Sequence, residues 1–439
     1  MSIPHPRSCN RSASTSRQFA LAITLLMMIA PALAEQPADW SEHSATLRAT
    51  MRDILTIPDE KIDLDAHTHR TFTGDGYVIE SITYASEPHS RVTALLYLPA
   101  QRRDKLPAVI VACGHGGSKS ALYAQYAGQL YAKLGFACLV PDTIGEEERQ
   151  KDGKMGARGH DLYHLKDNNP EFIRTTLKRM VLGKIVWDLI RGIDYLQARP
   201  EVDEDRIGIV GYSLGGASAG STAILDSRVR TAVICGWAFR ARYGEYSKYC
   251  TRMPYAAFTE VMGYDEMTAL LAPHCPTLFM VGEQDEIIDA DEGGAATKRD
   301  LEANIAGARK ILTANDIDTP IEAFFEPDAD HRPYFLSHRA AEWLQRWLIT
   351  SPHDRVAVPD RSIRFGQWVD AQGQRIERLY NTEKRERGLA VVDINAIYHD
   401  PKTLACFPDD ARPEPVYTMA GWVDAIAKTS TPDAPPPHR

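Results

Sequence analysis

The sequence predicts an α/β fold: a mostly parallel, mixed sheet with helices on both faces, followed by a C-terminal extension. Three observations predict it. Apolar runs of strand length alternate with segments of helical period between residues 77 and 350, which is typical of parallel strands joined by crossover helices. The first two strand-like runs have no helix between them, which indicates an antiparallel start. One apolar run ends directly in Gly-Tyr-Ser-Leu-Gly, residues 211–215.

The N-terminus has the features of a secretory signal peptide. Three arginines precede an apolar run from Phe19 to Ile29, and Pro31-Ala32-Leu33-Ala34 follows as a small-residue cleavage site. The apolar run is too short to span a membrane comfortably. We therefore expect residues 1–34 to be removed and the mature protein to be periplasmic or secreted.

Composition and cysteine usage indicate which partners, cofactors and disulfides to expect. The chain has 439 residues and a formal net charge of −9, so neither nucleic acid nor an anionic membrane is an expected partner. Cys250, Cys275 and Cys406 lie in irregular sequence, where export would permit a disulfide among them. There is no Cys-x-x-Cys pair, and the Asp-x-His-x-His of residues 65–69 is not followed by a pattern of further ligands. We expect no metal and no other cofactor.

Each predicted element follows from its apolar pattern. A helix over 44–55 precedes two antiparallel strands over 77–82 and 91–98. The buried strands are the apolar runs 107–113, 136–140, 206–210, 231–235, 276–281 and 321–325. Helices follow some of these strands over 121–134, 184–198, 296–314 and 340–348, where apolar positions recur at helical spacing. This alternation, with its antiparallel start, is the α/β-hydrolase architecture.

The predicted catalytic domain spans residues 35–350. Within it, residues 145–178 are polar and have no clear period. Long irregular loops in compact domains are usually functional, so this stretch is predicted to form a flap beside the site. The pattern changes beyond residue 350, and residues 351–439 are predicted to pack on the hydrolase domain as an extension. Its proline-rich end is predicted to be disordered.

The pentapeptide Gly211-Tyr212-Ser213-Leu214-Gly215 has the pattern of a nucleophile elbow. The serine of an elbow lies on a strained strand-to-helix turn, where bulky neighbours would clash and glycines do not. The turn raises the Ser213 hydroxyl above the sheet and points the next helix N-terminus toward it. We interpret Ser213 as a nucleophile rather than as part of an ordinary glycine-rich turn, because a strand-like run precedes it and a helix-compatible segment follows.

A serine nucleophile needs a base, and the base needs an orienting acid. In this fold the chain order is Ser, then Asp or Glu, then His. Asp285 follows a buried strand and is the predicted acid, with Glu283 as its local competitor. His331 follows the last core strand and is the predicted base, with His338 as the alternative. His274 precedes its strand and would lie at the opposite edge of the sheet.

The tetrahedral intermediate of acyl transfer needs hydrogen-bond donors for its oxyanion. The backbone N–H of Leu214, directly after the nucleophile, is the first predicted donor. The second is expected from the glycine-rich loop after an earlier buried strand, at Gly116 or Gly117. His115 precedes the serine in the chain, so we assign it to this loop rather than to the base.

These residues resemble the secreted esterases of the dienelactone hydrolase and acetyl xylan esterase group of α/β-hydrolases. The matching motifs are Cys113-Gly114-His115-Gly116-Gly117, Pro141-Asp142-Thr143 with Gly145-Glu146, Asp194-Tyr195-Leu196 with Arg199-Pro200, Arg206-Ile207-Gly208 with the elbow, Gly282-x-x-Asp285 and Asp330-His331. Two positions depart from relatives in the group. Dienelactone hydrolases proper carry cysteine where this chain has Ser213, and glucuronoyl esterases carry arginine where it has Leu214.

The resemblance implies hydrolysis of a small-molecule or polysaccharide ester through an acyl-enzyme, with deacetylation of a plant polysaccharide as the expected reaction. Trp237 follows a core strand and is predicted to stack on a sugar or line the acyl pocket, although a core role explains it equally well. Tyr212 and His115 are the other predicted substrate contacts. One alternative is a serine exopeptidase of the prolyl oligopeptidase-like type, which usually carries an additional selector domain. The other is a catalytically silent binding protein, which would commonly have lost a triad residue.

Overall fold

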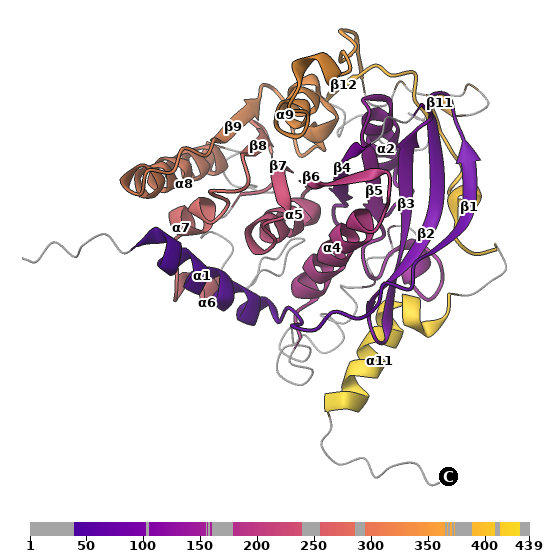
Figure 1. Cartoon of the computed structure of the whole chain (residues 1–439), viewed down its shortest axis with the longest axis horizontal. Coiled ribbons are helices and arrows are strands. Elements are labelled where there is room, and N and C mark those ends of the chain that lie inside the picture. Colours follow the sequence, from indigo (N-terminus) through magenta and orange to yellow (C-terminus); the bar gives the residue numbers. More distant parts are fainter. Residues whose placement is uncertain are drawn as a thin grey trace, which may run out of the picture. The chain divides into compact units, whose positions relative to one another are not determined.

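A computed structural model shows a nine-stranded mixed sheet with helices on both faces (Figure 1). The residues it describes are 39–101, 105–154, 156, 159, 179–238, 255–285, 295–364, 367, 369–370, 373, 389–408 and 413–430. The predicted signal peptide, residues 160–178 of the predicted flap and residues 431–439 lie outside them. The predicted α/β-hydrolase fold class is confirmed.

The sheet has the strand order β1-β2-β3-β5-β4-β6-β7-β8-β9. Strands β1, β2, β3 and β5 pair antiparallel in that order, and every pair from β5 to β9 is parallel. The strands are β1 (His67–Thr73), β2 (Tyr77–Glu87), β3 (Ser90–Pro99), β4 (Leu106–Ala112), β5 (Ala137–Pro141), β6 (Val202–Tyr212), β7 (Val229–Cys235), β8 (Thr277–Gly282) and β9 (Ile321–Glu326).

The central strands are the apolar runs that the sequence predicts. Every residue of β4, β5 and β8 is buried, because helices cover both faces of the parallel part of the sheet. The edge strand β1 is not predicted, since its sequence His-Thr-His-Arg-Thr-Phe-Thr lacks apolar alternation. Its side chains are mostly exposed, and its pairing with β2 defines it as a strand.

Helices cover the two faces of the sheet through two apolar clusters. Side chains of α1, α4, α5, α7 and α8 pack on one face, and side chains of α2, η4 and α9 pack on the other (Figure 1). The bounds are α1 (Trp40–Leu55), α2 (Leu122–Lys133), η1 (Glu147–Arg149), α4 (Val181–Gln197), α5 (Leu214–Leu225), α6 (Tyr255–Thr259), α7 (Tyr264–Ala269), α8 (Ala295–Ala314), η4 (Tyr334–Leu336) and α9 (His338–Leu348).

The order of strands reverses at β4, and this reversal places the site. From β4 the chain passes through α2 to β5 on one side, and then through α4 to β6 on the other side of β4. Open α/β sheets bind ligands beyond the carboxyl ends of the strands at such a switch point. The loop after β4 and the turn after β6, which contains Ser213, both emerge there.

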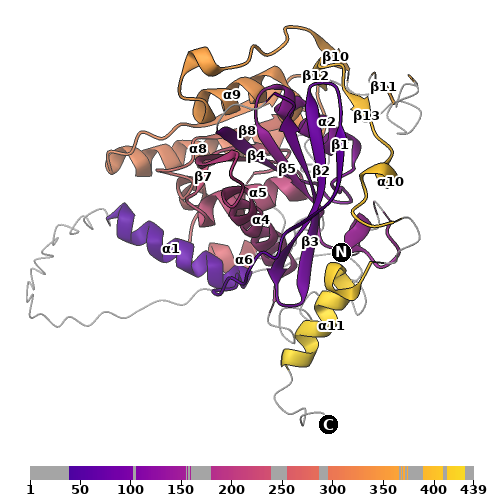
Figure 2. The same ribbon diagram turned by 45° about the vertical axis from the view of Figure 1, so that its right-hand side comes forward.

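The C-terminal extension follows α9 and packs against α2 and the antiparallel side of the sheet. Strand β10 pairs antiparallel with β12, and β11 pairs parallel with β13. Figure 2 shows α10 beside β1 and β2, and Ser81 of β2 donates a hydrogen bond to the carbonyl oxygen of Leu404 at 2.8 Å. The elements are η5 (Pro352–Asp354), β10 (Ser362–Arg364), β11 (Val369–Asp370), β12 (Ala390–Val392), β13 (Ile397–Tyr398), α10 (Pro401–Leu404), η8 (Pro415–Tyr417) and α11 (Met419–Ser430).

Two glutamines of α2 bind the extension as the edge of a strand would. The Gln125 side-chain amide donates to the carbonyl of His399 and accepts from its N–H, both at 2.9 Å. Gln129 makes the same pair of bonds to Ile397, at 2.7 and 2.9 Å. Four helical residues rise about 6 Å, and two strand residues rise about 6.6 Å. Glutamines four apart on a helix therefore match backbone groups two apart on an extended segment.

Candidate active site

Ser213 lies between β6 and α5 in a backbone conformation that L residues rarely adopt. Its φ is 61° and its ψ is −120°. The flanking glycines are required by close backbone approach: a Cβ on Gly211 would lie 2.0 Å from the Gly215 carbonyl oxygen, and a Cβ on Gly215 would lie 2.0 Å from that of Ala112. The glycines allow α5 to pack against the ends of β6 and β4, while Ser213 carries the strain. Strained residues of this kind cluster at active sites.

The loops after β8 and β9 bring Asp285 and His331 together. Nδ1 of His331 lies 2.8 Å from Oδ2 of Asp285, and both side chains are buried. The carboxylate accepts the hydrogen on Nδ1, which orients the ring and leaves Nε2 as the nitrogen with a free lone pair. Nε2 is buried and has no hydrogen-bond partner among the described residues.

The neighbours of the imidazole connect it to the elbow. Gly236, with a φ of 56°, lies against the ring, because a Cβ there would be 2.9 Å from Cε1 of His331. The preceding residue, Cys235, accepts the Ser213 N–H at 2.9 Å through its carbonyl oxygen. The ring of Tyr212 lies 4.8 Å from that of His331 between centroids, and its hydroxyl donates to the His331 carbonyl at 3.2 Å. Tyr212 and the 235–236 segment therefore contact both the elbow and the His331 loop.

The sequence alternatives for acid and base are engaged elsewhere. Glu283 is exposed and forms an ion pair with Lys298 at 3.4 Å. Nε2 of His338 lies 2.6 Å from a carbonyl oxygen of the segment that leads to β10. Nε2 of His274, which precedes β8, lies 2.8 Å from a carbonyl oxygen of α5. Of the candidates, the structure brings only Asp285 and His331 together.

The amides predicted to bind the oxyanion lie on the loop after β4 and at the start of α5. Leu214 is the first residue of α5, so its N–H has no intrahelical acceptor. The glycine-rich loop packs on the elbow, since a Cβ on Gly114 would lie 2.9 Å from the Tyr212 carbonyl oxygen. The Gly117 N–H donates to the Gly114 carbonyl at 2.8 Å, whereas the Gly116 N–H has no hydrogen-bond partner among the described residues. This geometry favours Gly116 over Gly117 as the second donor.

The three residues predicted to contact substrate differ in their surroundings. His115 is half-buried on the glycine-rich loop. Tyr212 donates its hydroxyl hydrogen to the His331 carbonyl oxygen, so the contact seen in the structure is with the predicted base, and a contact with substrate stays a prediction. Trp237 is only 4% exposed and belongs to the apolar cluster around α5. A Cβ on Gly216 would lie 2.7 Å from Cβ of Trp237, so core packing accounts for this tryptophan, and a contact with substrate stays a prediction.

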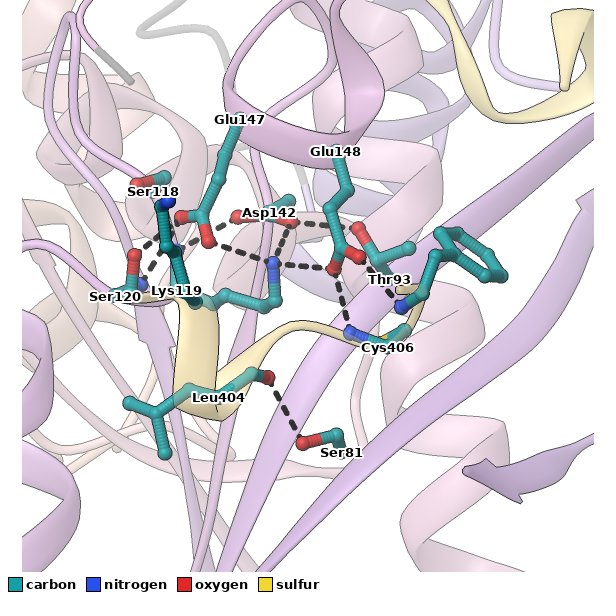
Figure 3. A network of polar contacts seen from close by, with 12 residues as sticks. Ser81, Thr93, Ser118, Lys119, Ser120, Asp142, Glu147, Glu148, Leu404 and Cys406 are labelled. Carbon is teal, nitrogen blue, oxygen red and sulfur yellow. Dashed lines mark hydrogen bonds and ion pairs between the residues drawn. The ribbon is translucent and has the colours of Figure 1, made fainter. Parts of the chain in front are cut away.

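The sequence did not indicate a group of buried charges beside the loop predicted to bind the oxyanion. Lys119 is fully buried and forms ion pairs with Asp142, Glu147 and Glu148 (Figure 3). The two glutamates belong to the start of the predicted flap, and residues 145–150 of that segment are buried. A polar, irregular sequence is typical of an exposed loop, so only the fold reveals that these distant charges converge.

Among the described residues, those considered for a metal site or a disulfide form neither. The described part of the chain contains no cluster of three or more His, Cys, Asp or Glu side chains that can hold a metal ion. His67 and His69 lie on the edge strand β1, beside Asp65 and the Thr83 hydroxyl respectively. Cys275 and Cys406 are buried free thiols, and Cys250 lies outside the described residues.

Among the described residues, no helix combines the length and the apolar character needed to cross a bilayer.

Proteins with this strand order, with a strained serine turn after the central strand and a carboxylate-bound histidine after the last, are α/β-hydrolases, and this chain is one. It belongs to the Dienelactone hydrolase family, whose sequence model matches residues 92–331, more than half of the chain. The protein is therefore an enzyme, a hydrolase of carboxylic esters. The predicted resemblance to this group is confirmed.

Individual relatives are distant. The protein of Bacillus subtilis (strain 168) named "Putative hydrolase YtaP" is 25% identical over 312 residues, which are 66% of this chain and 95% of that protein. The solved structure of Methylesterase BT1017 is similar with a TM-score of 0.59 and 17% identity, covering 90% of this chain and 76% of that one. Glucuronoyl Esterase from Solibacter usitatus is similar with a TM-score of 0.50 and 16% identity, covering 70% and 91%.

Proposed function

We propose that the protein is a serine esterase in which Ser213, His331 and Asp285 form the catalytic triad. Ser213 Oγ attacks the ester carbonyl while Nε2 of His331 takes its proton, and the same nitrogen then protonates the leaving alcohol. Water, activated by His331, releases the acid from the acyl-enzyme. The observation that carries this proposal is the 2.8 Å contact of His331 Nδ1 with Asp285, which leaves Nε2 as the nitrogen that can take a proton from Ser213.

The oxyanion of each tetrahedral intermediate would be bound by the N–H groups of Leu214 and Gly116. The first belongs to the N-terminus of α5, where the helix dipole also favours negative charge. The second belongs to the loop that packs on the elbow. Preorganised donors of this kind are each worth a factor of about 10² to 10³ in kcat.

For the substrate, we propose an ester carried by a carbohydrate, with an acetyl group on a plant polysaccharide as the first candidate. The sequence motifs resemble acetyl xylan esterases, and two proteins of similar fold are a methylesterase and a glucuronoyl esterase. In an acetylated xylan the sugar supplies the alcohol of the ester, whereas in a glucuronoyl ester the sugar supplies the acid. The substrate test must therefore distinguish acyl groups as well as alcohols.

The test measures acetate release from acetylated xylan, methanol release from a methyl-esterified polyuronate and hydrolysis of a simple acetyl ester. We expect acetate from xylan and from the simple ester, and loss of both activities in Ser213→Ala. Asp285→Asn should lose most of kcat, because it disturbs the tautomer of His331, whereas Glu283→Gln serves as its matched control and should keep it. Methanol release without acetate release would contradict deacetylation but retain the esterase.

The same protein samples test the two alternatives. Cleavage of a peptidyl amide in preference to every ester would indicate an exopeptidase. Failure of Ser213 to react with a fluorophosphonate would indicate a silent binding protein. Export is also proposed, from the signal-peptide pattern of residues 1–34, and N-terminal sequencing of the periplasmic or secreted protein should begin near Glu35.

A further inference from the structure

The loop predicted to bind the oxyanion continues into a fully buried segment, residues 118–120. Asp142 accepts the Lys119 backbone N–H at 2.8 Å through Oδ1. Glu147 accepts the Ser120 hydroxyl at 2.6 Å and the Ser120 N–H at 3.3 Å, both through Oε2. These two carboxylates fix the backbone directly after the glycines, so the position of the predicted oxyanion donor depends on them.

The side chain of Lys119 holds the carboxylates in turn. Its Nζ lies 2.7 Å from Asp142, 3.0 Å from Glu147 and 2.8 Å from Glu148 (Figure 3). Burial, together with repulsion from the two glutamates, raises the pKa of Asp142 to about 7 against the attraction of Lys119. Burial alone would lower the pKa of Lys119, but the three carboxylates raise it well above its ordinary value. The lysine therefore stays charged at neutral pH.

Glu148 extends this group to the C-terminal extension. Its Oε2 accepts the Cys406 N–H at 3.0 Å, and its Oε1 accepts the Phe407 N–H at 2.9 Å. One chain of contacts thus runs from the extension through Glu148, Lys119 and Glu147 to the backbone after the oxyanion loop (Figure 3).

Packing alone does not explain such a group. Burying ions has a large desolvation penalty, and well-packed apolar residues often stabilise a fold as well or better. Here three carboxylates surround one lysine, which is an unfavourable choice for stability. What the group provides is geometry, because each carboxylate accepts a backbone N–H from the loop after β4 or from the extension.

We propose that Lys119, Asp142, Glu147 and Glu148 are positioning residues for ester hydrolysis, and that through them the C-terminal extension is part of the catalytic unit. The inference rests on the proposed serine-esterase function, which requires an oxyanion donor at Gly116. A misplacement of about 1 Å at an active site can lower the rate by about 10²-fold. Variants that loosen these four residues without removing an oxyanion donor should have a kcat about tenfold lower.

Glu148→Gln is the most informative variant. It keeps the size of the side chain, but it removes the charge that faces Lys119 and one of two backbone acceptors. Gln129→Met is the control, because it removes both hydrogen bonds of Gln129 to the extension backbone, one more than Glu148→Gln removes, but has no contact with Lys119. With a simple acetyl ester, kcat should fall about tenfold in Glu148→Gln with little change in KM. The control should keep its kcat.

A transition-state analogue separates positioning from general loosening. A trifluoromethyl ketone forms a tetrahedral adduct with the nucleophile and places an oxyanion in the hole. Its Kd should rise in Glu148→Gln by the factor by which kcat/KM falls, while the Kd of the planar product acid stays unchanged.

Lys119→Arg keeps a cation and should retain more kcat than Lys119→Met, measured below the unfolding temperature of each variant. Glu148→Gln still decides the question if Lys119→Met does not fold.

Ser213→Ala, assayed alongside, distinguishes the failure of each proposal. If wild type hydrolyses the ester, Ser213→Ala does not, and Glu148→Gln keeps both kcat and ketone affinity, the positioning role is wrong and the esterase stands. Equal losses in Glu148→Gln and Gln129→Met would also overturn positioning, because any loosening of the extension would then suffice. If Ser213→Ala is as active as wild type, both proposals fail.

Discussion

Gly236 has no side chain, and its absence leaves room for the imidazole of His331. Its φ of 56° and its contact with the imidazole of His331 both exclude a Cβ. We predict that Gly236→Ala moves the His331 ring and lowers kcat on a simple ester by about 10-fold or more. Steady-state kinetics at a temperature where the variant remains folded would measure this loss.

Gly76 provides the control for this substitution. It also has a positive φ, of 84°, but a Cβ there would meet only the Lys133 side chain at 3.8 Å. Gly76→Ala should therefore destabilise the fold by about 1 kcal/mol through backbone strain and leave kcat unchanged. Similar losses of kcat in both variants would show that strain, rather than the position of the imidazole, controls the rate.

Single residues of the candidate site differ in how far a sequence can reveal them. Ser213, Asp285 and His331 can be proposed because each lies in the turn or loop after a strand-like run, and parallel strands end at one edge of the sheet. Lys119 and Glu148 cannot, because nothing local distinguishes a buried charge from an exposed one. Their partners come from segments far apart in the chain, so only the three-dimensional fold identifies them.

At the scale of elements, ion pairs join the start of α4 to the end of β2. Arg179, just before α4, donates to both carboxylate oxygens of Glu87 at 2.8 and 2.9 Å, and Lys184 of α4 lies 3.2 Å away. Burial alone would raise the pKa of Glu87, but the two cations outweigh it and lower the pKa to about 2. Because the folded-state pKa lies below the unfolded one, the stabilisation is present above about pH 5 and is lost as pH falls toward 2.

We predict that Glu87→Gln lowers the free energy of unfolding at pH 7 by about 3 kcal/mol. The difference from wild type should shrink by roughly half at pH 3.5, since the unfolded state of the wild type then binds a proton that the folded state does not. Urea unfolding of both proteins at the two pH values would measure it. A difference that does not change with pH would show that shape, and not charge, is what the glutamate contributes.

At the scale of the whole molecule, the buried strands of the sheet could be predicted from the sequence, whereas the strands of the C-terminal extension could not. The buried strands are long apolar runs, so their order of occurrence already indicates the α/β-hydrolase fold, which the structure confirms. Strands β10 to β13 are only two or three residues long, too short for any period. Side chains of α2 and of η1 hold this region, and such contacts leave no local pattern in the extension itself.

The similarity to Methylesterase BT1017 reaches further along the chain than the match to the family's sequence model. Residues 1–350 make up about four-fifths of the chain, so a likeness that covers 90% of it, as that to Methylesterase BT1017 does, includes part of the extension. The family match ends earlier, at residue 331. Part of the extension therefore belongs to a fold shared with at least one distant protein, although the family's sequence pattern does not reach it.

We predict that the extension unfolds together with the sheet. Residues 389–404 contribute to the same apolar cluster as α2 and α9, and the N–H groups of Ile397, His399 and Cys406 are bonded to glutamine and glutamate side chains. Native-state hydrogen exchange should protect these amides about as strongly as those of β4. Much faster exchange over residues 389–408 would show that the extension opens as an independent unit.

The paired amides of Gln125 and Gln129 also have a consequence for how this protein can diverge. They bind main-chain atoms of residues 397 and 399, so these hydrogen bonds constrain the two glutamines but not the side chains of residues 397 and 399. A shift of the extension by one residue would turn its N–H and C=O groups away from the helix, and a shift by two would restore them. Among relatives that keep this arrangement, alignments should show the two glutamines retained and insertions in the extension tolerated in pairs.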